Sequence, residues 1–198
     1  ISKEAFVTDI LVENGKIAAI GTGLNADGAE IIDATDLHVY PGFVEAHCHI
    51  GLDGYGIGYE GHDYNEMNDP VAPHLRAIDA INPFDPCMRM AAEAGVTSFA
   101  PGPGSANILG GTFAAIKPAG TCADDMIVKN DVAMKCAFGE NPKRCYGQSG
   151  KKSPMTRMAT AALLRELLFK TKRYLVDKEA GKNPGFDMKL EAMIPVIK

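Results

Sequence analysis

The chain has 198 residues, 46% of them hydrophobic, and its formal net charge at pH 7 is −5. This length is enough for one domain or one and a half, with a packed core. The acidic balance argues against a nucleic-acid partner, which would require a basic face, and no stretch approaches the roughly 20 consecutive apolar residues of a membrane span.

The first 40 residues are predicted to form a small β unit. Two apolar runs within residues 8–22 flank Asn14-Gly15, the dipeptide that most strongly indicates a two-residue hairpin turn. Residues 29–47 then predict two or three further short strands, separated by Pro41-Gly42.

A change of pattern after residue 50 predicts a long loop. Residues 53–70 are rich in Gly, Asp and Asn and show no periodicity, and such loops in compact domains are usually functional or disordered. The glycine-rich runs at 54–61 and 102–111 lack the Walker lysine and the spacing of a dinucleotide fingerprint. We therefore interpret them as loops at strand ends.

Helices and strands alternate in the rest of the chain, which is typical of an α/β fold. Asp85 and Gly95 are the expected first and last caps of one helix. The strands expected after it are residues 96–102, 112–120 and 132–142.

The longest helix is predicted to open at Ser153-Pro154 and to end at Gly181. Its apolar face is expected to consist of Ala161, Leu164, Leu168 and Leu175. Glu166 and Lys170 form an i,i+4 pair outside that face, and residues 186–198 predict the start of another helix and strand.

Cysteine usage indicates a reducing compartment. The five cysteines are an odd number without any Cys-x-x-Cys pair, which argues against a disulfide framework and a cysteine-rich zinc knuckle. We expect reduced thiols and a cytoplasmic location.

Two histidines end an apolar run, in the sequence PGFVEAHCHI at residues 41–50. Side chains alternate along a strand, so His47 and His49 are expected on one face and Cys48 on the other. Two imidazoles one pleat apart can bind a single metal ion. Imidazole is a suitable ligand for zinc and, with less selectivity, for Fe, Ni and Mn. A buried strand that ends in polar residues also fits a parallel barrel, where chemistry lies at the carboxyl ends of strands.

These residues resemble the opening of the amidohydrolase superfamily. The runs VENGKIAAIG and IIDATDLHVYPGFVEAHCHIG, within residues 9–51, are similar to its β-sandwich segment followed by the His-x-His of the first barrel strand. Residues 95–107 resemble its second strand, and residues 76–97 and 137–144 resemble its imidazolonepropionase-related branch. Glu45 stands where many members carry Asp.

The resemblance implies a (β/α)8 TIM-type barrel, of which only the first part is present in residues 41–198, after a β-sandwich segment in residues 1–40. It implies a metal-dependent hydrolase that cleaves a C–N bond in a cyclic amide or a dipeptide-like substrate. One or two divalent ions, most suitably zinc, would activate a water molecule.

In two-metal members of the superfamily, a lysine carboxylated on its nitrogen bridges the ions. Lys135, in VAMKCAFGE, resembles this lysine of prolidase-like members and is our predicted third ligand, with Lys117 and Glu140 as alternatives. His62 and His74 are predicted to contact substrate, and His38 to be structural.

Part of the expected site is missing from the sequence. The family supplies two further histidines and a late Asp, but no histidine follows residue 135, and a barrel needs about 250 residues. We expect the N-terminal portion of a longer enzyme, inactive alone, with the general-base Asp beyond Lys198. Its expected partners are a small-molecule substrate and either its own C-terminal half or a second copy. The alternative is a non-catalytic barrel fragment that acts as a binding or assembly module.

Overall fold

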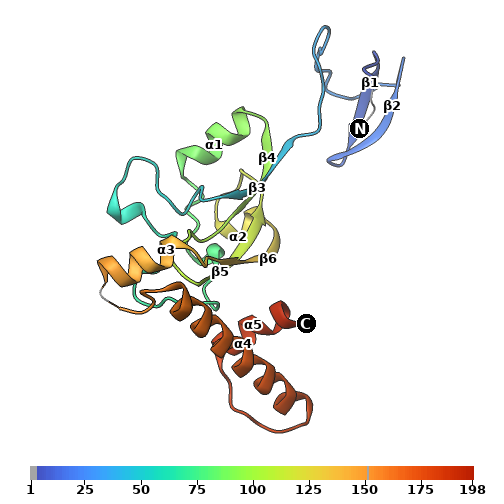
Figure 1. The fold of residues 1–198 in the computed structure, drawn as a ribbon. Coiled ribbons are helices and arrows are strands. Elements are labelled where there is room, and N and C mark those ends of the chain that lie inside the picture. Colours follow the sequence, from blue (N-terminus) through green and yellow to red (C-terminus); the bar gives the residue numbers. More distant parts are fainter. Residues whose placement is uncertain (1–3, 151) are drawn as a thin grey trace. The chain divides into compact units, whose positions relative to one another are not determined.

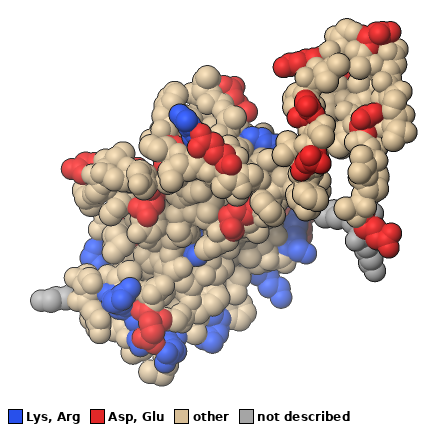
Figure 2. Space-filling view, turned by 90° about the horizontal axis from the view of Figure 1, so that it is seen from above, with Lys and Arg blue, Asp and Glu red and all other residues tan. Residues whose placement is uncertain are grey.

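The computed structural model describes residues 4–150 and 152–198, in which the chain forms two compact units, Ile1–Pro41 and Gly42–Lys198. Within those described ranges, no helix has the length and apolar character needed to cross a membrane. Acidic and basic side chains are scattered over the face drawn in Figure 2.

The first unit contains the predicted hairpin, formed by strands β1 (Asp9–Glu13) and β2 (Lys16–Gly21) in antiparallel pairing (Figure 1). Asn14 and Gly15 between them have φ of 51° and 72°. Positive φ at both central residues is the requirement of a type I′ turn, whose twist matches that of the paired strands.

The further strands predicted before Pro41 are wrong, because residues 22–42 contain no strand. Asp33 accepts hydrogen bonds from the main-chain and hydroxyl groups of Thr35, and Asp36 has φ of 60°. These local turns interrupt the extended backbone, and the apolar side chains of Ile31 and Ile32 stay exposed. The sandwich assigned to residues 1–40 therefore stays a prediction beyond its hairpin.

The second unit is built on a four-stranded sheet in the order β3 (Phe43–Cys48), β4 (Val96–Pro101), β5 (Leu109–Ile116) and β6 (Ile127–Cys136). Strand β3 is parallel to β4, and helix α1 (Pro86–Glu93) lies in the connection between them. The Asp85 carboxylate caps α1 by accepting from the Cys87 main-chain N–H at 2.8 Å, and Gly95 follows the helix with φ of 88°. The predicted helix and the strand after it are thus confirmed.

Strands β5 and β6 overlap the predicted ranges 112–120 and 132–142 but begin three and five residues earlier. Strand β5 pairs antiparallel with both β4 and β6. A (β/α)8 barrel requires parallel neighbours. Parallel pairing needs a crossover of a dozen or more residues. The connections here are shorter: residues 102–108 join β4 to β5, and residues 117–126, which contain the short helix α2 (Ala123–Met126), join β5 to β6. The α/β class is confirmed, the described sheet is mixed, and a complete barrel stays a proposal for the longer protein.

The main core lies between this sheet and α1. Phe99 of β4 and Ile116 of β5 are 1% and 0% exposed and pack with Leu52, Met88 and Met126. The single-turn helices η1 (Tyr59–Gly61) and η2 (Ala77–Asp79) lie in the long segment between β3 and α1. The buried residues of this core hold the ends of β3 and β4 at the same edge of the sheet.

Helices follow the sheet: α3 (Glu140–Pro142), the π-helical segment η3 (Lys143–Ser149), α4 (Arg157–Glu179) and α5 (Met188–Ile197). Helices α4 and α5 lie side by side (Figure 1), and Leu167 and Met193 pack on Leu109 of β5. The strand predicted near the C-terminus is wrong, because α5 occupies those residues.

Helix α4 begins at Arg157 instead of Ser153-Pro154, because the Thr156 hydroxyl caps it by accepting from the Ala159 main-chain N–H. Its buried face consists of Thr160, Leu167, Thr171 and Tyr174, and the predicted Ala161 is exposed. The predicted Leu164 and Leu168 flank that face, and the Glu166–Lys170 ion pair forms at 2.6 Å on the exposed side.

Candidate metal centre

His47 and His49 lie at the carboxyl end of β3, with ring centroids 5.3 Å apart and ring planes at 77°. In the sheet register, Cys48 at the end of β3 pairs with Pro101 at the end of β4. Strand β5 starts at this same edge, where Leu109 pairs with Cys136 at the end of β6. The topology therefore gathers the last residues of β3, β4 and β6 at one edge of the sheet.

The ring of His49 is fixed by the loop that follows β4. Its Nδ1 lies 2.7 Å from the carbonyl oxygen of Gly102, and the Gly102 N–H donates to the Cys48 carbonyl at 3.1 Å. A carbonyl can only accept, so Nδ1 carries the proton and Nε2 keeps its lone pair. A histidine ligand oriented by a hydrogen bond from its other nitrogen is the usual arrangement at protein metal sites.

His47 faces Lys135 of β6, whose Nζ lies 3.3 Å from the His47 Nε2. The Phe113 ring of β5 packs 5.5 Å from the His47 ring and 6.0 Å from the Lys135 Nζ, measured to the ring centroid. These residues border a cavity of about 330 Å³ whose other walls are mainly apolar, including Ala46, Ala100 and Met134. The cavity therefore combines apolar walls with one imidazole and one amine.

The cavity favours the uncharged forms of both groups. Desolvation lowers the pKa of His47, the charges of Lys135 and His49 lower it further, and Glu45 opposes them. Desolvation also lowers the pKa of Lys135. A neutral imidazole is the ligating form of histidine, and a neutral amine is the nucleophilic form of lysine.

The residues present fit part of a metal site. Within residues 4–150 and 152–198, no group of three or more His, Cys, Asp or Glu side chains is placed to hold an ion. Catalytic zinc usually has three protein ligands, whereas this edge offers two imidazoles and the Lys135 amine. The observation that matches a metal ligand is the 2.7 Å contact of His49 Nδ1 with the Gly102 carbonyl, which leaves Nε2 available to an ion.

The two alternative ligands lie elsewhere. Lys117 follows the far end of β5, where Ile116 pairs with Ile127, and its Nζ donates to the Ser98 hydroxyl at 2.8 Å. The structure thus brings Lys135 to His47 and leaves Lys117 at the opposite edge. The assignment of Lys135 as a ligand stays a prediction.

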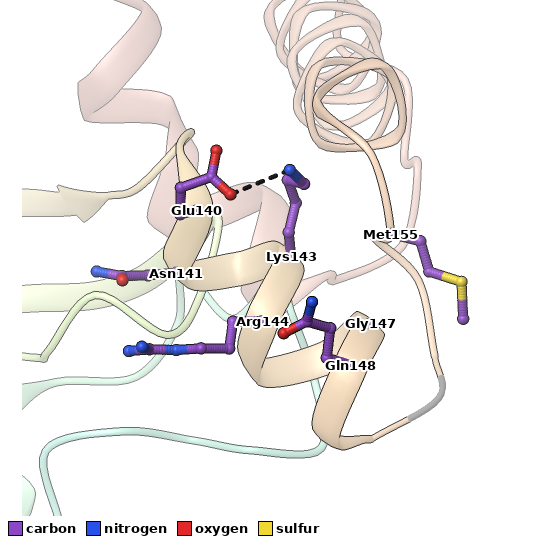
Figure 3. A pocket seen from close by; sticks show the side chains of 7 residues that line it. All are labelled: Glu140, Asn141, Lys143, Arg144, Gly147, Gln148 and Met155. Atoms are coloured by element: carbon purple, nitrogen blue, oxygen red, sulfur yellow. Dashed lines mark hydrogen bonds and ion pairs between the residues drawn. The ribbon is translucent and has the colours of Figure 1, made fainter.

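Glu140 lines a second cavity, of about 260 Å³, together with residues of η3. Figure 3 shows its carboxylate turned toward Lys143. The Lys143 Nζ lies 3.1 Å from the Glu140 Oε2, and Glu140 also pairs with Arg157. Hydrogen bonding and the charges of these two cations lower the pKa of Glu140. Its carboxylate is therefore engaged in ion pairs in this structure.

The remaining predicted residues have separate surroundings. His62 Nε2 lies 3.4 Å from Asp53 Oδ1, and its ring is 6.0 Å from that of Tyr64. His74 Nδ1 is buried and has no hydrogen-bond partner among the described residues.

Cys48 packs against the core, where burial raises the pKa of its thiol. In the first unit, His38 stacks on Tyr40 at 6.1 Å. Substrate contacts of His62 and His74 stay predictions.

Sequence reasoning missed Gly102 and Tyr64. The Tyr64 ring lies 5.3 Å from that of His49, at 31°. The run GPGSAN at residues 102–107 was the available signal, because closely spaced glycines indicate close approach of neighbouring groups.

No protein-family model matches the chain. The amidohydrolase tasK of Hapsidospora irregularis is 36% identical over 166 residues, which are 76% of this chain and 17% of that protein. The dihydroorotase of Ruminiclostridium cellulolyticum is 51% identical over 49 residues, 25% of this chain and 11% of that protein. The D-hydantoinase of Geobacillus stearothermophilus is 43% identical over 49 residues, 25% of this chain and 10% of that protein.

A crystal structure of an amidohydrolase from Thermotoga maritima MSB8 superposes with a TM-score of 0.88 and 44% sequence identity, over 93% of this chain and 50% of that one. The chain thus spans half of this solved relative and 17% of tasK. The agreement of sequence relatives and structural neighbour supports the amidohydrolase superfamily as the family of this chain.

Proposed function

We propose that the protein containing this chain is a metal-dependent hydrolase that cleaves the C–N bond of a cyclic amide. The observation that carries the proposal is the placement of His47, His49 and Lys135 at one edge of the sheet, with Lys135 Nζ 3.3 Å from His47 Nε2. The names dihydroorotase and D-hydantoinase favour a cyclic amide over the dipeptide-like alternative.

In this proposal His49 binds through Nε2, since Nδ1 is occupied by the Gly102 carbonyl. His47 and a carboxylated Lys135 supply the next ligands, and the neighbouring cavity of about 330 Å³ admits the substrate. The bound metal would supply a hydroxide nucleophile at neutral pH. We assign zinc, as one or two ions, because imidazole nitrogen is among its preferred ligands.

The finer assignments belong to the same proposal. They are the imidazolonepropionase-related and prolidase-like branch, a complete (β/α)8 barrel, a cytoplasmic location, and substrate contacts from His62 and His74. The further ligands and the general-base Asp would come from the part of the longer protein beyond Lys198.

The test is metal analysis of the full-length protein with His47 and His49 both changed to Ala. Loss of at least one equivalent of divalent metal is expected, whereas His38→Ala, in the first unit, keeps the wild-type content. Unchanged metal content in the double variant contradicts the proposal. Turnover of a panel of cyclic amides and dipeptides by the wild-type protein then distinguishes the two substrate classes.

A further inference from the structure

We infer that Tyr64 is a positioning residue, which holds the His49 ring in its ligating orientation, and that the absence of a side chain at Gly104 makes this contact possible. The inference rests on the proposed function, because it takes His49 to be a metal ligand.

The His49 ring has contacts on several sides. Its Nδ1 is held at 2.7 Å by the Gly102 carbonyl, and the His47 ring lies against it at 77°. The Tyr64 ring lies at 31° to the His49 ring, with centroids 5.3 Å apart. One hydrogen bond leaves an imidazole free to tilt about it, whereas an aromatic ring packed beside it restricts that tilt. Tyr64 therefore supplies the restraint that the hydrogen bond lacks.

Tyr64 is itself held by the loop that orients His49. The Gly104 N–H donates to the Tyr64 carbonyl at 2.6 Å, and the Ala106 N–H donates to Asn65 Oδ1 at 3.0 Å. The Gly102 carbonyl that accepts from His49 belongs to the same loop. Residues 102–106 thus fix both the acceptor for Nδ1 and the segment that carries the neighbouring ring.

This docking requires glycine at position 104. A Cβ atom there would lie 2.5 Å from Asn65 Oδ1 and 2.6 Å from Tyr64 Cδ2, and neither distance is tolerated between non-bonded atoms. Asn65 Oδ1 cannot withdraw without losing its hydrogen bond from Ala106. A methyl group at residue 104 would therefore push Tyr64 away from His49.

The ring of Tyr64, and not its hydroxyl, makes the contact. Across residues 4–150 and 152–198, the structure contains no hydrogen bond to the Tyr64 hydroxyl. Phenylalanine should therefore replace tyrosine at this position, whereas alanine should not. This contrast separates positioning of His49 from a chemical role of the hydroxyl.

The experiment titrates Co²⁺ into the metal-free full-length protein and follows the visible absorption of the bound ion. Tyr64→Ala and Gly104→Ala are each expected to weaken Co²⁺ affinity by about 10-fold or more, in line with other residues that orient metal ligands, and to change the absorption band at saturation. Tyr64→Phe should keep the wild-type affinity and band. Gly21→Ala is the matched glycine control, because its Cβ would meet only Leu24, at an ordinary 3.4 Å.

Wild-type affinity and absorption in Tyr64→Ala would overturn the inference, as would a Tyr64→Phe variant as weak as Tyr64→Ala. If circular dichroism shows that Tyr64→Ala has not folded, Gly104→Ala and Tyr64→Leu take its place. Each should then show weaker Co²⁺ affinity and a changed absorption band, and wild-type values in both would overturn the inference. His49→Ala separates the inference from the proposed function. If His49→Ala binds Co²⁺ as tightly as wild type, the metal proposal is wrong and this inference is wrong with it; if only the position 64 and 104 variants are silent, the inference alone is wrong.

Discussion

The Lys135 Nζ lies 3.3 Å from the His47 Nε2, although 88 residues separate the two in the chain. The contact exists because β3 and β6 end at the same edge of the mixed sheet. Desolvation is the main cause of the lowered pKa of His47, and the neighbouring charge of Lys135 lowers it further.

Replacement of Lys135 by Ala should therefore reduce the metal content of the full-length protein. The reason is the loss of the third nitrogen donor at this edge, or of the oxygen ligand that its carboxylated form would supply. Acetate, which is small enough for the cavity beside His47, should restore part of the bound metal. Lys117→Ala is the control and should bind metal normally, because Lys117 contacts Ser98 at the other end of β5. Equal loss in both variants would contradict the assignment of Lys135.

The buried Tyr146 hydroxyl should contribute to stability. Tyr146 is 0% exposed; its hydroxyl donates to the Glu66 carbonyl and accepts from Asn107 Nδ2 at 2.8 Å. Tyr146→Phe removes these bonds, but the Asn107 amide still donates to the Glu66 and Asp69 carbonyls, so the cost should be about 0.5–1.5 kcal/mol in the free energy of unfolding. Urea denaturation measures it. Tyr59→Phe, at a residue 87% exposed, should have no measurable effect.

The same residue predicts a loss of stability in alkaline solution. Burial, with the nearby charges of Glu66 and Asp69, raises the pKa of Tyr146 above its ordinary value of 10.0. A raised pKa means that the folded state holds its proton more tightly than the unfolded state, so the stabilisation is complete below about pH 10 and is lost as the pH rises toward the folded-state pKa. Denaturation midpoints should therefore fall above pH 10 in the wild type and fall less in Tyr146→Phe. Parallel curves would show that Tyr146 is not the group responsible.

Asp85 connects the start of α1 to the turn that follows His49. Its carboxylate accepts from the Cys87 N–H at 2.8 Å and from the buried Gly51 N–H at 3.0 Å. Asp85→Ala should cost about 1–3 kcal/mol, because a helix cap is lost and a buried donor is left unpaired. Asp85→Asn keeps one acceptor for the Cys87 N–H but places its NH2 group against the Gly51 N–H, so it should recover only part of this loss in thermal or urea unfolding. An Asn variant as unstable as the Ala variant would argue against the capping role.

Local signals predicted the elements that depend on neighbouring residues alone. Asn14-Gly15 indicated the hairpin, and Asp85 with Gly95 indicated the limits of α1, because turns and caps are satisfied within a few residues. The adjacent positions of His47 and His49 followed from strand alternation in the same way.

Features that depend on distant partners could not be predicted. The apolar residues Ile31 and Ile32 have a strand-like pattern, but a strand forms only where a partner pairs with it. The antiparallel pairing of β5 with β6 is set by a connection too short for a crossover, and this becomes apparent only when strand limits are known. The approach of Tyr64 to His49 depends on a glycine forty residues further along the chain, at position 104.

The isolated 198-residue chain is expected to associate and to lack hydrolase activity. Strands β3 and β6 are the two outer strands of the four-stranded sheet, and each has one side without a paired neighbour. Each also exposes apolar side chains, with Val44 73% and Val128 59% exposed. Unpaired edges with apolar residues favour pairing with another chain, and two histidines with one lysine leave the metal site short of ligands. Val44→Lys and Val128→Lys place a charge on each edge and should reduce association without altering β1 and β2. Light scattering of the purified chain, with and without these substitutions, measures the association, and turnover of cyclic amides with added zinc measures the activity. A wild-type chain that remains monomeric and hydrolyses a cyclic amide in a zinc-dependent manner would contradict both parts of the expectation.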